Sequence, residues 1–315
     1  MTLACVFPGQ GSQSVGMLAE LAAQHPLIQR TFAEASGALG YDLWQRVSQG
    51  PAEQLNATEC TQPAMLSAGI ATWRLWQEQG GVAPALVSGH SLGEFTALVC
   101  AGALEFAAAV TLVRDRGRYM QAAVPAGGGA MAAILGLDDA AAEAACAQAA
   151  QAEVVEAVNY NAPGQIVIAG QASAVERAIA AAKARGAKRA VLLPVSVPAH
   201  SSLMQNAAAQ LRERLAGLAF AVPRIAYLSA VDAQLHGDSE EIRTLLVRQL
   251  ASPVRWSATV LALTSGGANL LLECGPGKVL TSLNRRIERR PEITCLAIED
   301  QASLRAALDA TRSAT

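Results

Sequence analysis

The sequence predicts an α/β protein, in which a large domain with a parallel sheet core carries a small inserted ferredoxin-like domain. Two observations support this prediction. Short apolar runs alternate with longer helical patterns along most of the chain, which is the element order of an α/β domain. After a cluster of breakers at residues 125–129, the elements instead follow the order β-α-β-β-α-β, which is typical of a ferredoxin-like unit.

Composition supports this fold class and limits the partners. The chain has 315 residues, of which 52% are hydrophobic and only 4% aromatic. A core built mainly from Ala, Leu and Val suits helices packed on a parallel sheet better than a β-sandwich. The formal net charge of -2 offers no general attraction to nucleic acid or to an anionic membrane, so neither is expected as a partner.

The cysteines and the N-terminus indicate a cytoplasmic protein. Six cysteines are scattered without a C-x-x-C pair, and several lie inside apolar runs, where a thiol behaves as a small hydrophobic group. The start MTLACVFPGQG lacks the basic and long apolar regions of a signal peptide. No apolar stretch reaches the length of a membrane span, so we expect a soluble protein in the reducing cytoplasm.

The elements of the first third follow in order. An apolar run at Leu3–Phe7 enters the glycine-rich turn PGQGSQ and predicts a strand. A helix is expected after this turn, helical patterning continues over residues 25–39 and 63–79, and a second short strand covers 85–87. Two further helices are expected, one running toward residue 102 and one over 106–120.

The inserted domain is predicted at residues 125–196, so that residues 1–124 and 197–315 together form the large domain. Its strands are expected at 130–136, 154–159, 165–169 and 190–195, and its helices at 138–150 and 173–185. The remainder returns to α/β patterning, with strands at 225–228 and 269–273 and a helix that ends near residue 250.

The stretch VSGHSLGE places Ser91 between two glycines, with an apolar run on either side. G-x-S-x-G is the pattern of a nucleophile elbow, a sharp strand-to-helix turn that exposes a nucleophilic serine. We refer to the turn around Ser91 as the elbow. Backbone N–H groups at the start of the following helix would then stabilise a developing oxyanion. The alternative is an ordinary serine N-cap, which the pentapeptide by itself leaves open.

A serine nucleophile needs a base, and the chain has only four histidines. His25 and His236 lie in polar surroundings and are expected at the surface. His90 adjoins Ser91 on a sharp turn, so its side chain should support the turn rather than accept the proton. Elimination leaves His200, which follows the strand that ends the inserted domain, although a histidine before two serines could also be an ordinary loop residue.

Arg116 is a candidate for binding a substrate carboxylate. It lies in a helical pattern whose apolar positions include Val113 and Met120, and Arg114 and Arg118 cannot share its face. An inward arginine would hold a carboxylate with two parallel hydrogen bonds. The alternative is a surface arginine paired with a neighbouring acidic residue.

Other chemistries lack their motifs. The early glycines do not have G-x-G-x-x-G spacing, and the GPGKV segment at 275–279 lacks the first glycine and the Ser/Thr of a phosphate loop. No H-E-x-x-H motif or cysteine cluster provides a metal-ligand set. We therefore expect no cofactor and no metal. The basic run RRIERR at 285–290 is expected to be a solvated helix face or, less simply, a docking patch for an acidic partner.

Seven blocks in order along nearly the whole chain resemble the malonyl-CoA:acyl carrier protein transacylase family of fatty acid synthesis. They are FPGQGSQ, GHSLGE, RDRGRYMQ, NYNAPGQIVIAG, PVSVPAHSSLM, VRQLASPVRW and ECGPGKVL. The resemblance implies a hydrolase-like large domain with a ferredoxin-like insertion and an active site between the two. It also implies malonyl-CoA and an acyl carrier protein as partners.

The resemblance also implies roles for particular residues. Ser91 would be the acylated nucleophile, His200 its base, and Arg116 the group that binds the malonyl carboxylate. The backbone N–H groups of Gln10 and Leu92 would form the oxyanion hole. The main-chain carbonyl of Gln249 would orient the histidine, in place of the acidic residue of a catalytic triad.

Three alternatives to this function remain open at the level of sequence. An α/β-hydrolase esterase would need an acidic residue between the serine and the histidine, for which Asp138 and Asp139 are the loop-like candidates. A non-catalytic acyl-binding protein would leave the elbow and His200 unexplained. A related transferase serving malonate decarboxylase or a polyketide pathway is the nearest alternative. The chain departs from the family at Ser229-Ala230, where relatives often carry asparagine. The packing near His200 is therefore not predicted.

Overall fold

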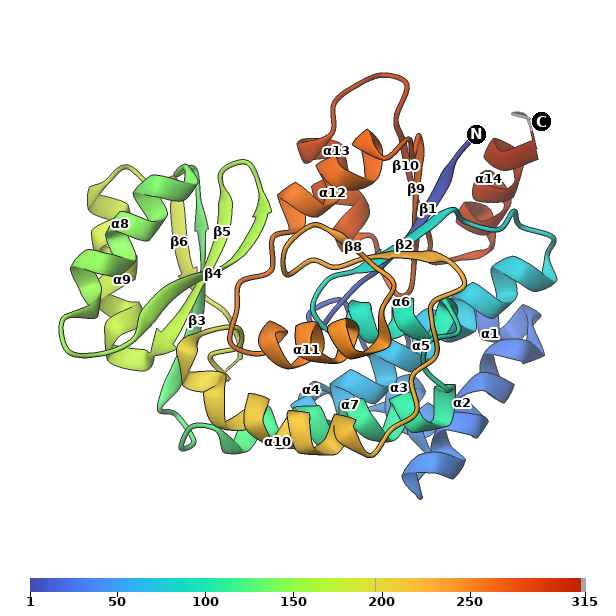
Figure 1. Cartoon of the computed structure of the whole chain (residues 1–315), viewed down its shortest axis with the longest axis horizontal. Coiled ribbons are helices and arrows are strands. Elements are labelled where there is room, and N and C mark those ends of the chain that lie inside the picture. The colour runs from blue at the N-terminus through green and yellow to red at the C-terminus, as the bar shows by residue number, and fades with distance from the viewer. Residues whose placement is uncertain (196, 313–315) are drawn as a thin grey trace.

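The computed structural model describes residues 1–195 and 197–312, which form two subdomains of unequal size (Figure 1). The larger contains a six-stranded sheet with both chain ends, and the smaller contains a separate four-stranded sheet. The predicted fold class is confirmed: an α/β domain with a parallel-dominated sheet carries a ferredoxin-like insertion.

The six-stranded sheet has the strand order β10-β9-β1-β2-β7-β8. All neighbouring strands are parallel except β7 and β8, which form an antiparallel edge. The central strands β1, β2 and β9 are buried along their whole length, as expected for a parallel sheet covered by helices on both faces. The strands are β1 (Leu3–Phe7), β2 (Leu86–Gly89), β7 (Ala226–Leu228), β8 (Leu235–His236), β9 (Leu270–Cys274) and β10 (Thr294–Ile298).

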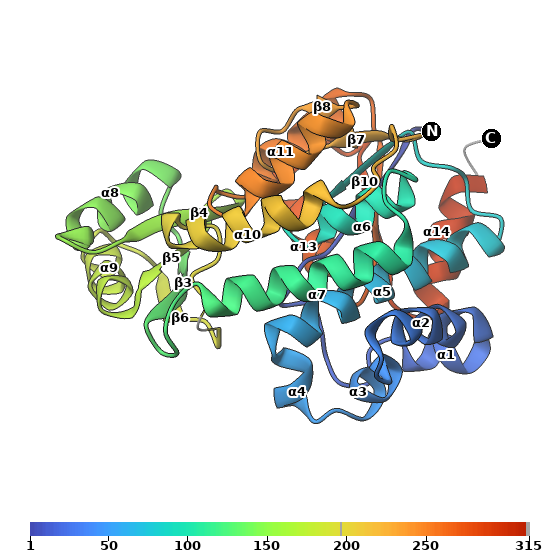
Figure 2. The ribbon, with the colours of Figure 1, turned by 60° about the horizontal axis from the view of Figure 1, so that its bottom comes forward.

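Helices before and after the insertion complete the large subdomain (Figures 1 and 2). The longest, α5, is buried over most of its length and packs against α7, α2 and α6. These helices are α1 (Ala19–Gln24), α2 (Pro26–Leu39), α3 (Leu43–Gln49), α4 (Ala52–Asn56), α5 (Thr58–Glu78), α6 (Gly93–Cys100), α7 (Phe106–Ala122), α10 (Gln205–Ala216), α11 (Ser239–Gln249), α12 (Trp256–Ser265), α13 (Val279–Ile287) and α14 (Gln301–Arg312). In the described part of the chain, no helix is both long and apolar enough to cross a membrane.

The small subdomain has the predicted β-α-β-β-α-β order and an antiparallel sheet of order β4-β5-β3-β6. Its elements are β3 (Gly129–Leu135), α8 (Asp139–Ala150), β4 (Val155–Ala162), β5 (Gln165–Gln171), α9 (Ala172–Ala184) and β6 (Arg189–Leu192). Both helices pack on one face of this sheet through small side chains, mostly alanines, which allow the helices to approach the strands closely.

Several elements differ from the prediction. Helix α5 begins at Thr58, five residues earlier than expected. Pro63 lies within its first two turns, where the missing N–H removes only one helical hydrogen bond, so the proline does not mark the start of the helix. The last strand of the insertion ends at Leu192 rather than at residue 195. Helices α3, α4, α10, α12 and α14 and strands β8 and β10 were not predicted, and the helix expected at the basic run is α13, which begins earlier, at Val279. The predicted limit at residue 196 and the last three residues lie outside the described residues, so the domain boundaries remain a prediction.

Candidate active site

Ser91 lies on a sharp turn between the end of β2 and the start of α6, and its backbone has φ +52°. The flanking glycines make this turn possible. A Cβ at Gly89 would lie 1.9 Å from the carbonyl carbon of Gly93, and a Cβ at Gly93 would lie 2.0 Å from the Phe7 carbonyl oxygen. Only glycine fits at either position. The N-cap interpretation of Ser91 is wrong, because Leu92 is the N-cap residue of α6.

The structure brings the His200 side chain to Ser91. Its Nε2 lies 2.8 Å from Ser91 Oγ, and its Nδ1 lies 2.8 Å from the main-chain oxygen of Gln249. A carbonyl oxygen can only accept a hydrogen bond, so Nδ1 carries the proton and Nε2 is free to accept from the serine hydroxyl. Burial, and then the cation of Arg116, lower the pKa of His200 to about 3. The imidazole is therefore neutral at pH 7.

The hydrogen bond to Gln249 also excludes the acidic partner that an esterase triad would need. Asp138 accepts a hydrogen bond from Ala141 N as the N-cap of α8, in the small subdomain. Asp139 lies in the first turn of the same helix. Neither aspartate is the partner of His200, whose Nδ1 already donates to the Gln249 carbonyl.

Arg116 points inward from α7 and is only 1% exposed. Its Nη2 donates to Ser91 Oγ at 3.2 Å and to Gln249 Oε1 at 2.8 Å, and its Nη1 donates to Gln62 Oε1 at 2.9 Å. Its Nε is buried and has no hydrogen-bond partner within residues 1–195 and 197–312. Burial lowers the pKa of Arg116 to about 10, which still leaves the guanidinium charged at pH 7. The surface alternative for this arginine is wrong.

The neighbouring arginines bind elsewhere, as the helical spacing predicts. Arg114 pairs with Asp115 at 2.8 Å, and Arg118 pairs with Glu59 at 2.7 Å. Both ion pairs are at least partly open to solvent. Arg116 is therefore the member of this basic stretch that reaches Ser91.

The side chains that hold this arrangement were not predicted from the sequence. Gln249 contributes its amide as well as its carbonyl, since Nε2 donates to Ser91 O at 2.9 Å and to Glu94 Oε1 at 2.8 Å. Glu94 and Gln62 are each 1% exposed. A signal for Glu94 was present, because a carboxylate in the apolar helix after the elbow must find partners if it is buried. Gln62 carried no such signal.

The remaining histidines have structural partners. His90 Nε2 lies 2.8 Å from Asn161 Oδ1, so this histidine supports the elbow from the side of the small subdomain. His25 lies 2.8 Å from Gln301 Oε1 and is only half-buried. The expectation of a solvated His236 is wrong: its side chain is 9% exposed and lies against Asp232 and Glu241, because His236 pairs with Tyr227 in the edge strand β8.

The glycine-rich turn after β1 packs against the elbow, as an oxyanion hole from Gln10 and Leu92 would require. A Cβ at Gly9 would lie 2.5 Å from the carbonyl oxygen of His90, so the two turns are in close contact. His90 N also donates to the Phe7 carbonyl at 3.0 Å. Gln10 is half-buried and Leu92 is buried beside Ser91. The contribution of their N–H groups stays a prediction.

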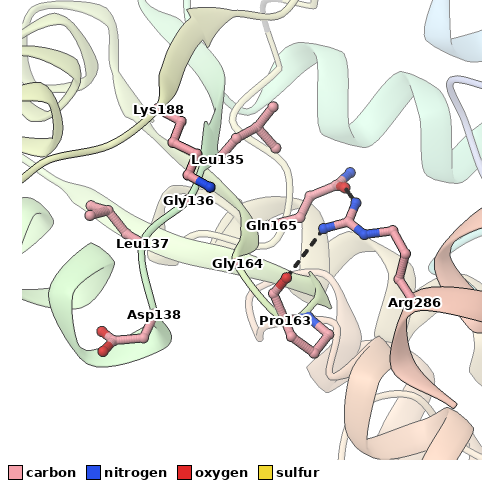
Figure 3. Close-up of a pocket in the computed structure, with 9 residues that line it drawn as sticks. All are labelled: Leu135, Gly136, Leu137, Asp138, Pro163, Gly164, Gln165, Lys188 and Arg286. Atoms are coloured by element: carbon pink, nitrogen blue, oxygen red, sulfur yellow. Dashed lines mark hydrogen bonds between the residues drawn. The ribbon is translucent and has the colours of Figure 1, made fainter. Parts of the chain in front are cut away.

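The basic run at 285–290 is not a single solvated helix face, because α13 ends at Ile287. Arg285 donates to the Cys295 carbonyl at 2.8 Å, and Arg290 pairs with Glu288 at 2.6 Å. Arg286 reaches the small subdomain, where it donates to the Pro163 carbonyl at 3.2 Å (Figure 3). The partners of Arg285 and Arg286 are outside the run, so these two contacts could not be predicted from the run itself.

Arg286 also borders a cavity of about 490 Å³ between the subdomains (Figure 3). Leu135, Leu137 and Lys188 of the small subdomain form other parts of its wall. None of the six predicted site residues borders this cavity. In the part of the chain that the structure describes, no group of three or more His, Cys, Asp and Glu side chains could hold a metal ion.

Comparisons with known proteins agree with this geometry. Residues 4–297 match the acyl transferase domain family. The chain is 56% identical over 305 residues to the malonyl CoA-acyl carrier protein transacylase of Salmonella typhimurium, covering 97% of this chain and 98% of that protein.

Solved structures are similarly close. The malonyl-CoA:acyl carrier protein transacylase of Xanthomonas oryzae superposes with a TM-score of 0.96 at 54% identity, covering 98% of this chain and 99% of that one. A malonyl-transacylase solved in complex with a type II PKS acyl-carrier protein also gives a TM-score of 0.96, at 53% identity, covering 98% and 100%. The chain therefore belongs to the malonyl CoA-acyl carrier protein transacylase family of acyl transferases.

Proposed function

We propose that this chain transfers the malonyl group from malonyl-CoA to the phosphopantetheine thiol of an acyl carrier protein, supplying malonyl units for fatty acid biosynthesis. A malonyl ester of Ser91 is the intermediate. The observation that carries this proposal is the position of Ser91 Oγ, which lies 2.8 Å from the base His200 and 3.2 Å from the cation of Arg116. A nucleophile, its base and a carboxylate-binding group thus meet at one atom.

In the first half-reaction, Ser91 Oγ attacks the thioester carbonyl of malonyl-CoA while His200 Nε2 takes the hydroxyl proton. The N–H groups of Gln10 and Leu92 stabilise the oxyanion of the tetrahedral intermediate. Collapse of the intermediate breaks the C–S bond, and the imidazolium returns its proton to the departing CoA thiolate. The carbonyl of Gln249 holds the histidine in the required tautomer and stabilises its transient charge.

In the second half-reaction, the carrier thiol gives its proton to His200, and its sulfur attacks the malonyl ester. The Ser91 alkoxide leaves and recovers the proton from the imidazolium. Water must be kept from the ester, because hydrolysis would turn the transferase into a thioesterase. Every step uses side chains, backbone N–H groups and the two thiols, so the proposal includes no cofactor.

Arg116 provides the preference for malonyl over acetyl in this proposal. Its guanidinium is buried and charged, and its Nε has no partner among the described residues. A malonyl carboxylate would supply an acceptor for this cation, whereas an acetyl group would leave it unpaired. A planar guanidinium also matches the geometry of a carboxylate better than an ammonium does.

The cytoplasm is the proposed location. All six cysteines are free thiols, and five of them are buried. Unpaired cysteines are typical of a reducing compartment. The proposed acyl donor and acceptor also both carry thiols that must stay reduced.

Mass spectrometry of the intact protein tests the proposed reaction. Malonyl-CoA alone should add one malonyl group, which peptide mapping should locate on Ser91. Addition of a carrier protein bearing phosphopantetheine should then return the mass to that of the parent. An acyl group on a cysteine, or a Ser91→Ala variant that is still acylated, would contradict the proposal.

A further inference from the structure

One buried carboxylate is not used by the proposed mechanism. Glu94 lies one helical turn after Ser91, on α6, and is 1% exposed. Its Oε2 accepts hydrogen bonds from the hydroxyls of Tyr227 and Ser229, the latter at 2.9 Å, and its Oε1 accepts from Gln249 Nε2 at 2.8 Å. A buried carboxylate with three donors from two other parts of the fold is a built arrangement, and it needs a physical account.

Glu94 determines which way the Gln249 side-chain amide points. The Nε2 end of that amide faces two acceptors, Glu94 Oε1 and the Ser91 carbonyl, and the Oε1 end faces the guanidinium of Arg116. In the reversed orientation, the amide oxygen would face two acceptors and the amide nitrogen would face a cation. Glu94 Oε1 is the side-chain acceptor at the Nε2 end, so it contributes strongly to excluding the reversed orientation.

The oriented amide in turn positions Arg116. Gln249 Oε1 lies 2.8 Å from Arg116 Nη2, the same nitrogen that lies 3.2 Å from Ser91 Oγ. If the amide turned or moved away, this nitrogen would lose its shorter hydrogen bond and keep the longer one to Ser91 Oγ, so the guanidinium plane would be less firmly held. A substrate carboxylate needs that plane at a defined angle, because its two-pronged binding is directional.

An indirect link also keeps the carboxylate site open. A glutamate bonded directly to Arg116 would occupy the donors that the substrate needs. The Gln249 amide lies between the two side chains, so Glu94 acts on Arg116 without occupying its donors, and Arg116 Nε stays without a partner in the described part of the chain.

We propose that Glu94 is a positioning and specificity residue, which orients Arg116 through the Gln249 amide and thereby sets the preference for malonyl over acyl groups that lack a carboxylate. This inference rests on the proposed roles of Ser91 and Arg116. Glu94 does not touch the substrate. Its contribution belongs to the preorganisation of the site.

The first test compares Glu94→Ala with Glu94→Gln, with kcat/KM measured for malonyl-CoA and acetyl-CoA. Glu94→Ala should lower the malonyl-to-acetyl ratio by at least about tenfold, since small displacements of a binding group can cost up to about 10²-fold. In Glu94→Gln, the amide oxygen can still accept from Gln249, and the hydroxyls of Tyr227 and Ser229 can rotate to accept from the new NH₂ group. This variant should therefore keep the ratio within about threefold of the parent.

A matched control separates positioning from general stability. Ser229→Ala removes a hydrogen bond to Glu94 Oε2 but leaves the contact of Oε1 with Gln249. It should lower the melting temperature without changing the malonyl-to-acetyl ratio by more than about twofold. If Ser229→Ala and Glu94→Ala lower the ratio equally, the role of Glu94 is only to hold the fold together and the proposal is wrong.

A double-mutant cycle tests the route through Gln249. Gln249→Ala keeps the main-chain carbonyl that faces His200 but removes the amide. In that background, Glu94→Ala should cause no further loss of the ratio, because the connecting group is already absent. Additive losses would overturn the proposal, and so would a Glu94→Gln variant that loses the ratio as fully as Glu94→Ala.

Arg116→Ala and malonyl labelling of Ser91 distinguish this inference from the proposed function. If Arg116→Ala keeps the malonyl preference, or Ser91 is not labelled, the underlying function fails. If both behave as proposed while Glu94→Ala keeps the parent ratio, only the role of Glu94 fails.

Discussion

At the scale of single residues, the candidate site depends on two backbone conformations that residues other than glycine rarely adopt. Ser91 has φ +52° and His200 has φ +67°, and neither is a glycine. Such conformations persist only where the surrounding structure holds them in place. The close backbone contacts at Gly89 and Gly93 hold the turn at Ser91. For His200, the hydrogen bond from Nδ1 to the Gln249 carbonyl fixes the ring.

Arg116 gives the most direct prediction at this scale. Arg116→Ala should lower kcat/KM for malonyl-CoA by about 10- to 100-fold, which corresponds to about 1.5–3 kcal/mol for a hydrogen bond to a charged group, and should raise relative use of acetyl-CoA. Arg116→Lys should recover only part of the malonyl activity, because an ammonium lacks the planar geometry. Arg114→Ala and Arg118→Ala are controls, since their ion pairs with Asp115 and Glu59 lie elsewhere. An unchanged ratio in Arg116→Ala would refute the assignment.

His200 is expected to control the rate of acylation more than the binding of substrate. His200→Ala should slow the formation of the malonyl enzyme by about 10²–10⁴-fold, the usual contribution of a general base, with little change in the dissociation constant of malonyl-CoA. His90→Ala is the matched control because His90 Nε2 faces Asn161 rather than Ser91. Rapid-quench measurement of acylation decides between them. Normal acylation in His200→Ala with slow acylation in His90→Ala would reverse the assignment.

The low pKa of His200 has a consequence for pH dependence. Burial and the nearby Arg116 cation lower it to about 3, so the base should stay neutral from pH 8 to pH 5. The rate of acylation of the free enzyme should therefore show no ascending limb near the ordinary histidine pKa of about 6.5. Because this pKa is lowered on folding, the histidine supports the folded state above about pH 6.5, and that support is lost as the pH falls toward 3. A limb near pH 6.5 that disappears in His200→Ala would contradict this prediction.

At the scale of elements, close helix contacts place Arg116. Gly117 follows Arg116 on α7, and a Cβ there would lie 2.7 Å from the Thr58 carbonyl oxygen at the start of α5. The glycine therefore lets the two helices approach until their backbones touch. A Cβ at Gly37, in α2, would meet no described atom within 4 Å beyond its own helix and chain neighbours, so this position has no packing reason to be glycine.

These two helical glycines should respond oppositely to alanine. Gly117→Ala should destabilise the protein by about 1–3 kcal/mol through overpacking, and it should also lower malonyl activity because α7 carries Arg116. Gly37→Ala should stabilise the protein by about 0.5–1 kcal/mol, since alanine favours the helix. Urea unfolding of both variants measures the two free energies. A stabilising Gly117→Ala would show that α7 can shift away from α5 at no cost.

At the scale of the whole molecule, strand β4 of the small subdomain packs against α12 and α13 of the large one. Tyr160 N donates to the Val254 carbonyl at 2.9 Å, and Val254 N donates to the Val158 carbonyl at 2.9 Å. Asn161, next along β4, lies 2.8 Å from His90, the neighbour of Ser91. Strand β4 thus connects the insertion to the catalytic elbow through both backbone and side chain.

Asn161→Ala tests this connection. Removing the amide takes away the hydrogen-bond partner of the half-buried His90 ring, which should lower the free energy of unfolding by about 0.5–1.5 kcal/mol. Acylation should also slow, because the elbow loses support beside Ser91. Asn206→Ala, on an exposed position of α10, serves as the control and should change stability by less than about 0.5 kcal/mol. Equal stability of the two variants would mean that the subdomains are held together without this contact.

Local physical rules explain how far the sequence could predict the molecule. The buried strands β1, β2 and β9 were identifiable because parallel core strands are short continuous apolar runs. The ferredoxin-like insertion was identifiable from the order of its elements. Short or polar elements were missed: β8 has two residues, and α13 begins after Lys278 without a side-chain cap. The start of α14 did carry a signal, because Asp300 precedes it and accepts a hydrogen bond from Ser303 N at 2.8 Å. Tertiary packing, rather than local propensity, stabilises such elements.

By itself, the sequence determined the fold class, the elbow around Ser91 and the resemblance to one family, because glycine geometry, apolar periodicity and ordered motifs are properties of neighbouring residues. Only the tertiary structure decided which groups meet. Ser91 and His200 are 109 positions apart, and Gln249 lies 158 positions from Ser91. The protonation states and side-chain orientations of His200, Arg116 and Glu94 depend on burial and on hydrogen bonds between residues far apart in the sequence. Such contacts exist only once the chain has folded.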